Sequence, residues 1–440
     1  MNRLKAERSL GLDTAVALVV GEIIGVGIFL TPAEMTRALG SPFWVLLVWL
    51  AVGATVICGS LCYGELAARY PQAGGGYVYL REAWGPAPAV LYGWMSLLIM
   101  DPGLSAALGV GLARYAGALV PLGEAAQKGV AIAAILVLAA VTAAGVRVSA
   151  GMVRLLTALK LLLLGAIVVW SFASGRGSWS HFVPFFEPRP GSAPLVAGLA
   201  VGLMSAFYAF GGFWDVAKIG GEVREPTRTL PRALVLGVGV ATIVYVLTSA
   251  AFLYLVPIEA VDSDAAFAAQ AGAALFGGAG ARVFAAIVLV TIGGSLAAVV
   301  MTAPRVYVAM ARDRVFFGAA GRIDPRFGTP LRAIALEAVL ASIVVALAGF
   351  KSIVAYFVFV TVAFVALTVA GLYRMPRPAA GTFRVPGWPL TPLAFLALLG
   401  VLLVILAAGR PFEAALGTAV VAAGFPVYRL FVAPRARQPL

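Results

Sequence analysis

Charged side chains inside long apolar stretches are the residues of this chain that could do chemistry. Lys160 lies in the middle of RLLTALKLLLLG, and Glu22 lies in GEIIGVGIFLTP. Asp101 occurs in another apolar stretch, and Asp215 and Lys218 in a further one. A charge inside a bilayer is expensive, so it must be paired, protonated or turned toward a ligand. These side chains could therefore form ion pairs, bind protons or contact a charged solute.

Two clusters of glycine accompany these charges. Gly21, Gly25 and Gly27 fall within one apolar stretch, and Gly211 and Gly212 interrupt another. Glycine costs about 1 kcal/mol relative to alanine in a helix interior, so each cluster predicts a helix that breaks inside the membrane. A membrane tolerates the freed N–H and C=O groups only where they face a cavity or a ligand. Paired interruptions in two halves of a chain are typical of the binding site of a secondary transporter.

The composition predicts a membrane protein. The chain is 62% hydrophobic and 12% charged, whereas soluble domains carry about 25% charged residues. About twenty apolar residues cross a bilayer, and the chain has roughly twelve such stretches. We expect an all-α polytopic membrane protein with 12 transmembrane helices and both termini in the cytoplasm. The expected spans are 12–38, 43–68, 87–120, 129–146, 150–173, 195–221, 233–256, 280–312, 332–349, 352–373, 389–408 and 412–432.

The net charge of +13 has a topological explanation. With both termini inside, this segmentation places most of the 32 lysines and arginines on the cytoplasmic side. This distribution is the positive-inside rule, so the basic surplus orients the protein and does not indicate binding to nucleic acid.

The sequence predicts neither catalysis nor a metal centre. His181 is the only histidine, and the two cysteines, Cys58 and Cys62, lie one turn apart in an apolar span, where we expect them to be packing residues. The chain shows no paired carboxylates in an aqueous cleft and no nucleophile with a histidine base. We expect no enzymatic activity, no cofactor and no metal.

Six motifs, in order and spacing, closely resemble those of the amino acid, polyamine and organocation transporter superfamily. The closest resemblance is to its L-type amino acid transporter branch, and it covers residues 10 to about 330. The motifs are GEIIGVGIF, YGELAARYPQAGGGYVYLREAWG, RLLTALKLLLLG, AFYAFGGF, GEVREPTRTLPRA and PRVYVAMARDRVF.

The resemblance implies a leucine-transporter-like fold of two inverted five-helix repeats. Within one transmembrane domain over 1–440, the first repeat would occupy 1–174 and the second 195–373, followed by a peripheral helix pair at 389–432. Spans one and six would be broken near the midplane and would face each other.

The resemblance also implies where an amino acid would bind. A half-helix start would hold the substrate carboxylate, and unwound carbonyls would hold its ammonium. Tyr208 matches an aromatic position that closes the site from outside in relatives, although its aromatic neighbours could instead indicate simple packing. The glycines could likewise serve only close helix packing. The implied substrate-binding residues are Ile23, Ile24, Gly25, Val26, Gly27, Tyr208, Ala209, Phe210 and Gly211.

Lys160 matches a lysine that, in sodium-independent members of this fold, replaces a sodium ion between spans one and eight. Its expected partners are the carbonyl region of Gly21 to Gly25 and the hydroxyl of Ser295. The resemblance therefore implies transport without sodium. A lysine that snorkels to the cytoplasmic face is the alternative, but the position of Lys160 deep in its span makes that reach long.

Two acidic residues depart from the family pattern. Glu22 replaces a small residue, and Asp101 precedes Pro102 where an arginine is usual. Glu22 could bind a coupling proton, pair with Lys160 or Lys218, or recognise a cationic substrate, and these three hypotheses stay open. For Asp215 we favour an ion pair with Lys218 at the i, i+3 spacing.

These observations predict a sodium-independent secondary transporter in a plasma membrane, of the bacterial inner-membrane type. The expected substrates are small or medium neutral L-amino acids, carried by exchange or proton symport through alternating access. A carrier of cationic amino acids or polyamines is the alternative, and a transport-fold sensor or channel is a distant one. Some relatives need a subunit attached through a cysteine near the outer ends of spans three and four. This chain has none there, so we expect it to work alone within the lipid.

Overall fold

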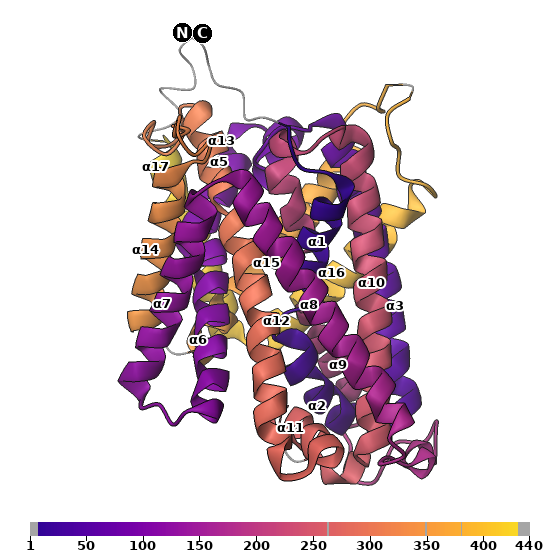
Figure 1. Ribbon diagram of the computed structural model, residues 1–440. Helices are drawn as coiled ribbons and strands as arrows, with labels where there is room; N and C mark the ends of the chain where they lie inside the picture. The colour runs from indigo at the N-terminus through magenta and orange to yellow at the C-terminus, as the bar shows by residue number, and fades with distance from the viewer. Residues whose placement is uncertain (1–7, 262–263, 348–349, 380, 430–440) are drawn as a thin grey trace.

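The computed structural model describes residues 8–261, 264–347, 350–379 and 381–429. Helices form nearly all the regular structure in these ranges, and a single isolated bridge pairs Leu10 with Val223. Most helices run along one long axis of the bundle (Figure 1). The all-helical polytopic class expected from the sequence is therefore confirmed.

The bounds of the elements follow in chain order. They are α1 (Leu12–Ile23), α2 (Gly27–Leu39), α3 (Pro42–Arg69), α4 (Gly76–Trp84), α5 (Pro86–Met95), η1 (Ser96–Met100), α6 (Asp101–Leu119), α7 (Glu124–Ala143), α8 (Val146–Ala173), η2 (Trp179–Phe182), α9 (Leu195–Ala209), η3 (Phe213–Glu222), α10 (Pro226–Leu255), η4 (Ile258–Ala260), α11 (Asp264–Phe276), η5 (Gly277–Ala279), α12 (Gly280–Thr302), α13 (Pro304–Arg312), α14 (Leu331–Leu347), α15 (Phe350–Ala370), η6 (Gly371–Tyr373), α16 (Leu390–Gly409) and α17 (Pro411–Val427).

Eight helices among the described residues are long and apolar enough to cross a membrane, and the bent pair α1 and α2 makes nine. The other predicted spans correspond to α14 and α17, of 17 residues each, and to α15. The twelve-span count, the inverted repeats and the cytoplasmic termini therefore remain predictions.

Both predicted helix breaks are present. The axes of α1 and α2 differ by 45° across Ile24 to Val26, so the first span is broken. In Figure 1, α1 lies toward one end of the bundle and α2 toward the other. The second break separates α9 from the 3-10 helix η3, where Gly212 adopts a φ of +94°. This left-handed conformation favours glycine, which explains the residue type at that position.

The broken segments occupy the centre of the bundle. α1 packs against α8, α10 and α12, and α2 packs against α9 and α11. Small residues permit this packing, since a Cβ on Gly237 of α10 would lie 2.4 Å from a methyl of Val19 in α1. The break in the first span is therefore enclosed by protein and does not face lipid.

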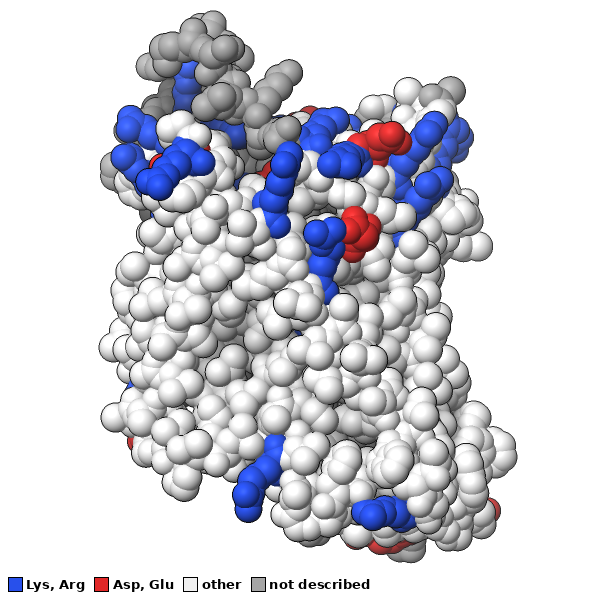
Figure 2. Space-filling model, viewed as in Figure 1, with Lys and Arg blue, Asp and Glu red and all other residues white. Residues whose placement is uncertain are grey.

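Lysine and arginine gather at one end of the molecule (Figure 2). In the view of Figures 1 and 2 this is the upper end, where α5 and α13 lie, while the middle of this face is almost free of charge. An uncharged belt between two charged ends is what a bilayer requires.

Candidate functional site

The first break leaves backbone donors without partners. The Gly25 N–H donates to Ile23 O at 2.9 Å, and α2 then begins at Gly27 with no side-chain cap. Among the described residues, no acceptor faces the N–H groups of Val26, Gly27 and Ile28. Because the N-terminus of a helix carries partial positive charge, these donors form a ready site for a carboxylate.

Lys160 binds the backbone carbonyls that the first break releases at the end of α1. Its fully buried Nζ donates to Gly21 O at 2.9 Å and Ile24 O at 2.8 Å, and lies 3.1 Å from Ser295 Oγ. Ser295 Oγ itself lies 2.7 Å from Gly21 O. The ammonium therefore sits at the negative end of α1, among the partners that the sequence predicted, and it does not reach the surface.

Tyr245 of α10 joins the two breaks. Its buried hydroxyl lies 2.7 Å from both Ile23 O and Ala209 O. Because a hydroxyl has one proton, it donates to one of the two carbonyls at a time. No sequence motif singled out Tyr245, although a tyrosine in an apolar span needs a partner for its hydroxyl.

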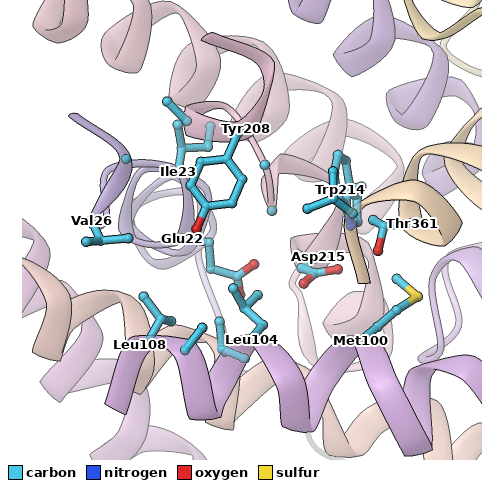
Figure 3. Close-up of a pocket in the computed structure, with 18 of the residues that line it drawn as sticks. Glu22, Ile23, Val26, Met100, Leu104, Leu108, Tyr208, Trp214, Asp215 and Thr361 are labelled. Carbon is cyan, nitrogen blue, oxygen red and sulfur yellow. The ribbon is translucent and has the colours of Figure 1, made fainter. Parts of the chain in front are cut away.

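A cavity of about 100 Å³ lies between the two breaks. Figure 3 shows Ile23, Glu22 and Val26 on one side, with Leu104 and Leu108 of α6 forming the floor in that view. The volume has room for several water molecules, so a small or medium solute would fit. Seven of the nine predicted binding residues line this cavity: Ile23, Gly25, Val26, Gly27, Tyr208, Ala209 and Gly211.

The remaining two predicted binding residues do not line the cavity. Ile24 is fully buried, and its carbonyl accepts from Lys160. The Phe210 ring is also fully buried and packs edge-on against Trp49 and Tyr245, with ring centroids 6.1 and 5.1 Å apart. The sequence could not separate ring packing from pocket lining in an aromatic-rich run.

Gly27 and Gly25 have a packing requirement in addition to lining the cavity. A Cβ on Gly27 would lie 2.8 Å from Cα of Ala209, and one on Gly25 would lie 3.1 Å from Ser295 Oγ. The two broken helices can therefore approach each other only because Gly27 has no side chain. Close helix packing is thus a requirement at Gly27, and the same residue also lines the cavity; its role in binding stays a prediction.

Lys218 lies between two acidic residues. Its Nζ is 2.8 Å from Asp101 Oδ1 on α6 and 2.9 Å from Asp215 Oδ1 on its own element η3. The other oxygen of Asp101, Oδ2, accepts from Ser96 Oγ, and Tyr307 Oη lies 3.4 Å from it. The predicted i, i+3 pair is thus present, whereas the link from Lys218 to Asp101 was not predicted. It ties the second break to α6.

No ion pair joins Glu22 to Lys160 or Lys218 among the described residues, although such a pair was one of the three roles that the sequence left open. Its Oε1 accepts from Thr302 Oγ1 at 2.8 Å, and its buried Oε2 has no partner among the described residues. Glu22 faces Asp215 across the cavity (Figure 3). Three carboxyl groups around one ammonium leave excess negative charge, which a proton or a cationic group could neutralise.

The quoted motifs outside the breaks also contact one another. Arg305 Nε donates to Glu222 Oε1 at 2.9 Å in a buried ion pair, and Leu10 N donates to Glu222 O at 3.0 Å. Tyr77 Oη donates to Asp313 Oδ2 at 2.8 Å. Burial, together with the neighbouring carboxylate, raises the pKa of Tyr77, so this hydroxyl stays protonated as the donor. These contacts close the end of the bundle where η3 and α13 meet.

Two opposed helix breaks that enclose a cavity, with uncapped N–H donors on one break and buried charges around it, define a membrane transporter of the broken-helix class. The model of the family described as "Amino acid permease" matches residues 10–427. The chain belongs to this family, within the amino acid, polyamine and organocation superfamily. Its family and relatives are transporters and not enzymes, and it is a multi-pass protein of the plasma membrane.

Curated relatives cover most of the chain. It is 30% identical to the b(0,+)-type amino acid transporter 1 of Oryctolagus cuniculus over 84% of this chain and 76% of the relative. It is 28% identical to the serine/threonine exchanger SteT of Bacillus subtilis over 90% of each chain. An uncharacterized transporter of Mycobacterium tuberculosis is 33% identical over 98% of this chain and 93% of the relative.

Proposed function

We propose that this protein carries small or medium neutral L-amino acids across the membrane without sodium, by exchange or proton symport through alternating access. One observation carries this proposal: three N–H groups at the start of α2 have no acceptor among the described residues, and a cavity lies beside them. The similarity to a serine/threonine exchanger supports both the substrate size and exchange.

The geometry favours one orientation of the substrate. Its carboxylate would accept from the N–H groups of Val26, Gly27 and Ile28. Its ammonium would lie near the Ile23 carbonyl, which Lys160 does not hold, and near the carbonyls that end α9. Its side chain would then extend toward Leu104 and the Tyr208 ring, which both line the cavity (Figure 3). Apolar walls of this kind suit a neutral side chain.

The position of Lys160 supports sodium independence. Its ammonium already occupies the space between α1 and α12, where it holds two backbone carbonyls and the Ser295 hydroxyl. A sodium ion would need the same oxygens, and the repulsion between two cations would oppose it.

One experiment tests the main proposal. Purified protein in liposomes is given a panel of labelled amino acids, with and without internal substrate, sodium and a pH gradient. We expect uptake of neutral amino acids that internal substrate or a pH gradient stimulates and that sodium leaves unchanged. Strict sodium dependence, or flux that does not saturate, would contradict it.

A cationic amino acid or polyamine is the second candidate substrate, because Glu22 Oε2 lies unpartnered beside the cavity. The same panel decides between the candidates. Stronger competition by arginine, lysine or a polyamine than by alanine, leucine or phenylalanine would overturn the neutral assignment.

Glu22→Gln then separates the three roles of this carboxyl. Loss of the pH dependence of uptake, with neutral substrates still bound, assigns a coupling proton to Glu22. Selective loss of cationic substrates assigns it to substrate recognition. Loss of folded protein, measured by size-exclusion chromatography, leaves a structural role through Thr302. Glu187→Gln is a matched control, since Glu187 is an exposed carboxylate in the loop before α9.

We further propose that Tyr208 gates the cavity, that the chain forms one domain of two inverted repeats with a peripheral pair, and that it works without a protein subunit. The Tyr208 side chain is partly exposed and projects from α9 toward the side of the cavity that holds Glu22 (Figure 3). An aromatic ring with two rotatable bonds can cover such an opening and swing away from it.

A further inference from the structure

A second cavity lies away from the helix breaks, where α3 ends and the segment before α16 folds back over it. It has a volume of about 300 Å³. Its walls come from the last turns of α3, from Leu372 of η6, and from residues 375–378 and 384–388. None of its lining residues lines the cavity between the breaks, so it is a separate site.

Three arginines line this second cavity. Arg69 forms its deep wall: it is nine-tenths buried, it pairs with Glu65, and its Nε has no partner among the described residues. Arg377 and Arg384 are exposed and supply the outer wall. Three guanidinium groups against one carboxylate give the cavity two excess positive charges, so its chemistry favours an anion with several oxygens.

The cavity is held in shape by hydrogen bonds at its base. Val385 N donates to Glu65 Oε2 at 2.6 Å, and Arg69 Nη1 donates to Pro376 O at 2.6 Å. Arg384 Nη2 donates to Pro378 O at 2.9 Å. Hydrogen bonds thus hold the guanidinium groups of Arg69 and Arg384 in place before a ligand arrives.

The surroundings of the cavity place it at the surface of the membrane. Trp388 lines it, stacks near Tyr373 with ring centroids 4.7 Å apart, and is 40% exposed. The apolar span α16 begins two residues later, with Leu390 73% exposed and Leu393 48% exposed. Aromatic pairs of this kind lie at headgroup level, and exposed leucines beyond them face acyl chains.

We propose that this second cavity binds the phosphate group of an anionic glycerophospholipid. The phosphate would accept from Arg377 and Arg384 and from the free Nε–H of Arg69, while the acyl chains would run along the exposed leucines of α16. A lipid bound there would join a core helix, α3, to the peripheral helix α16. The proposal does not depend on which substrate the cavity between the breaks takes.

The test uses Arg377→Gln with Arg384→Gln in the full-length protein. The matched control is Arg322→Gln with Arg326→Gln, two exposed arginines in the loop after α13. Each protein is purified in detergent, titrated with phosphatidylglycerol or phosphatidylcholine, and examined by native mass spectrometry and thermal melting. Because each basic residue contributes about 1 kcal/mol to binding an anionic lipid, we expect phosphatidylglycerol affinity to fall at least about tenfold in the cavity variant.

The control variant should retain wild-type affinity for phosphatidylglycerol. Equal affinity in the cavity variant and the wild type would overturn the proposal, and so would equal affinity of the wild type for the two lipids. Arg377→Lys with Arg384→Lys should keep much of the binding, because charge at the outer wall is conserved. If the cavity variant melts early without lipid, the titration by mass spectrometry at low temperature still measures its affinity.

Inorganic phosphate distinguishes the two sources of the ligand. It is added to the wild type in phosphatidylcholine at the concentration at which phosphatidylglycerol protects against melting. We expect no protection by free phosphate. Protection equal to that of phosphatidylglycerol, and absent in the cavity variant, would show a site for a soluble anion and would overturn the lipid assignment.

Discussion

Each helix break must be stabilised inside the membrane, and different contacts stabilise the two breaks. At the first break, the carbonyls released at the end of α1 are held by Lys160 from α8 and Ser295 from α12. At the second break, η3 is held to α6 by the ion pair of Lys218 with Asp101. Fixed donors on buried carbonyls do not change with substrate, whereas an ion pair among excess carboxylates responds to a proton or a cation.

This difference assigns different tasks to the two breaks. We expect the first break to be the rigid part of the site, since side chains from neighbouring helices satisfy its backbone. We expect the second to move, because Tyr208 precedes it on α9 and the ion pairs of Lys218 with Asp101 and Asp215 lie beside it. Tyr245, within hydrogen-bonding distance of one carbonyl at each break, couples the two.

Removal of the Lys160 ammonium from the first break should have the largest effect on transport. Lys160→Ala removes the donor that the carbonyls of Gly21 and Ile24 share, and the single Ser295 hydroxyl proton can satisfy only one of them at a time. One buried carbonyl is then left unpaired, at about 1–3 kcal/mol. Uptake in liposomes should fall at least about tenfold, while size-exclusion chromatography still shows folded protein. Lys128→Ala, at an exposed lysine of α7, is the control and should transport normally. Normal uptake by Lys160→Ala would remove the distinction between the two breaks.

A large side chain introduced between the two breaks should have the next largest effect, on substrate binding. Gly27→Leu would force a side chain against Ala209, where even a Cβ lies 2.8 Å from Cα, so equilibrium binding of a labelled amino acid should be lost. Gly211→Leu should also abolish binding by filling the cavity that it lines. Gly239→Leu, where a Cβ meets nothing within 4 Å, serves as the control. Unchanged affinity in Gly27→Leu would mean that the site lies elsewhere.

Removal of the Tyr245 hydroxyl tests whether this residue couples the two breaks. Tyr245→Phe keeps the ring that packs against Trp49 and Phe210 but removes the hydroxyl. One lost hydrogen bond of about 1 kcal/mol predicts a roughly fivefold loss of uptake rate with little change in melting temperature. If rate and affinity both stayed at wild-type values, the two breaks would not communicate through this residue.

The smallest effect should come from the proposed gate. Tyr208→Phe should transport within about twofold of wild type, because the ring that lines the cavity remains. Tyr208→Ala removes the cover and should raise the rate at which bound substrate escapes, measured by washout from the purified protein. Equal washout from the Ala and Phe variants would assign the ring to packing alone.

Much of the fold could be predicted, because a helix that crosses a membrane needs a long apolar stretch and a break in it needs particular residues, and both can be read from neighbouring positions of the sequence. Apolar length located the helices, and the glycine clusters located both breaks. The contacts of Lys160 with Gly21, Ile24 and Ser295 also followed from the sequence, through the resemblance to known transporters. Whether the Phe210 ring packs against other rings or lines the cavity did not follow from the sequence, because both roles require the same residue type. A role of its carbonyl in binding stays a prediction.

The sequence by itself determined which charges lie inside the membrane and where the backbone must open, since both follow from residue types along a single helix. Only the tertiary structure decided how those charges are distributed. Asp101 pairs with Lys218 although 117 positions separate them, and Glu22 contacts Thr302 across 280 positions. Buried charges are neutralised by whatever the packing brings within about 3 Å, and local sequence does not encode helix packing at that resolution.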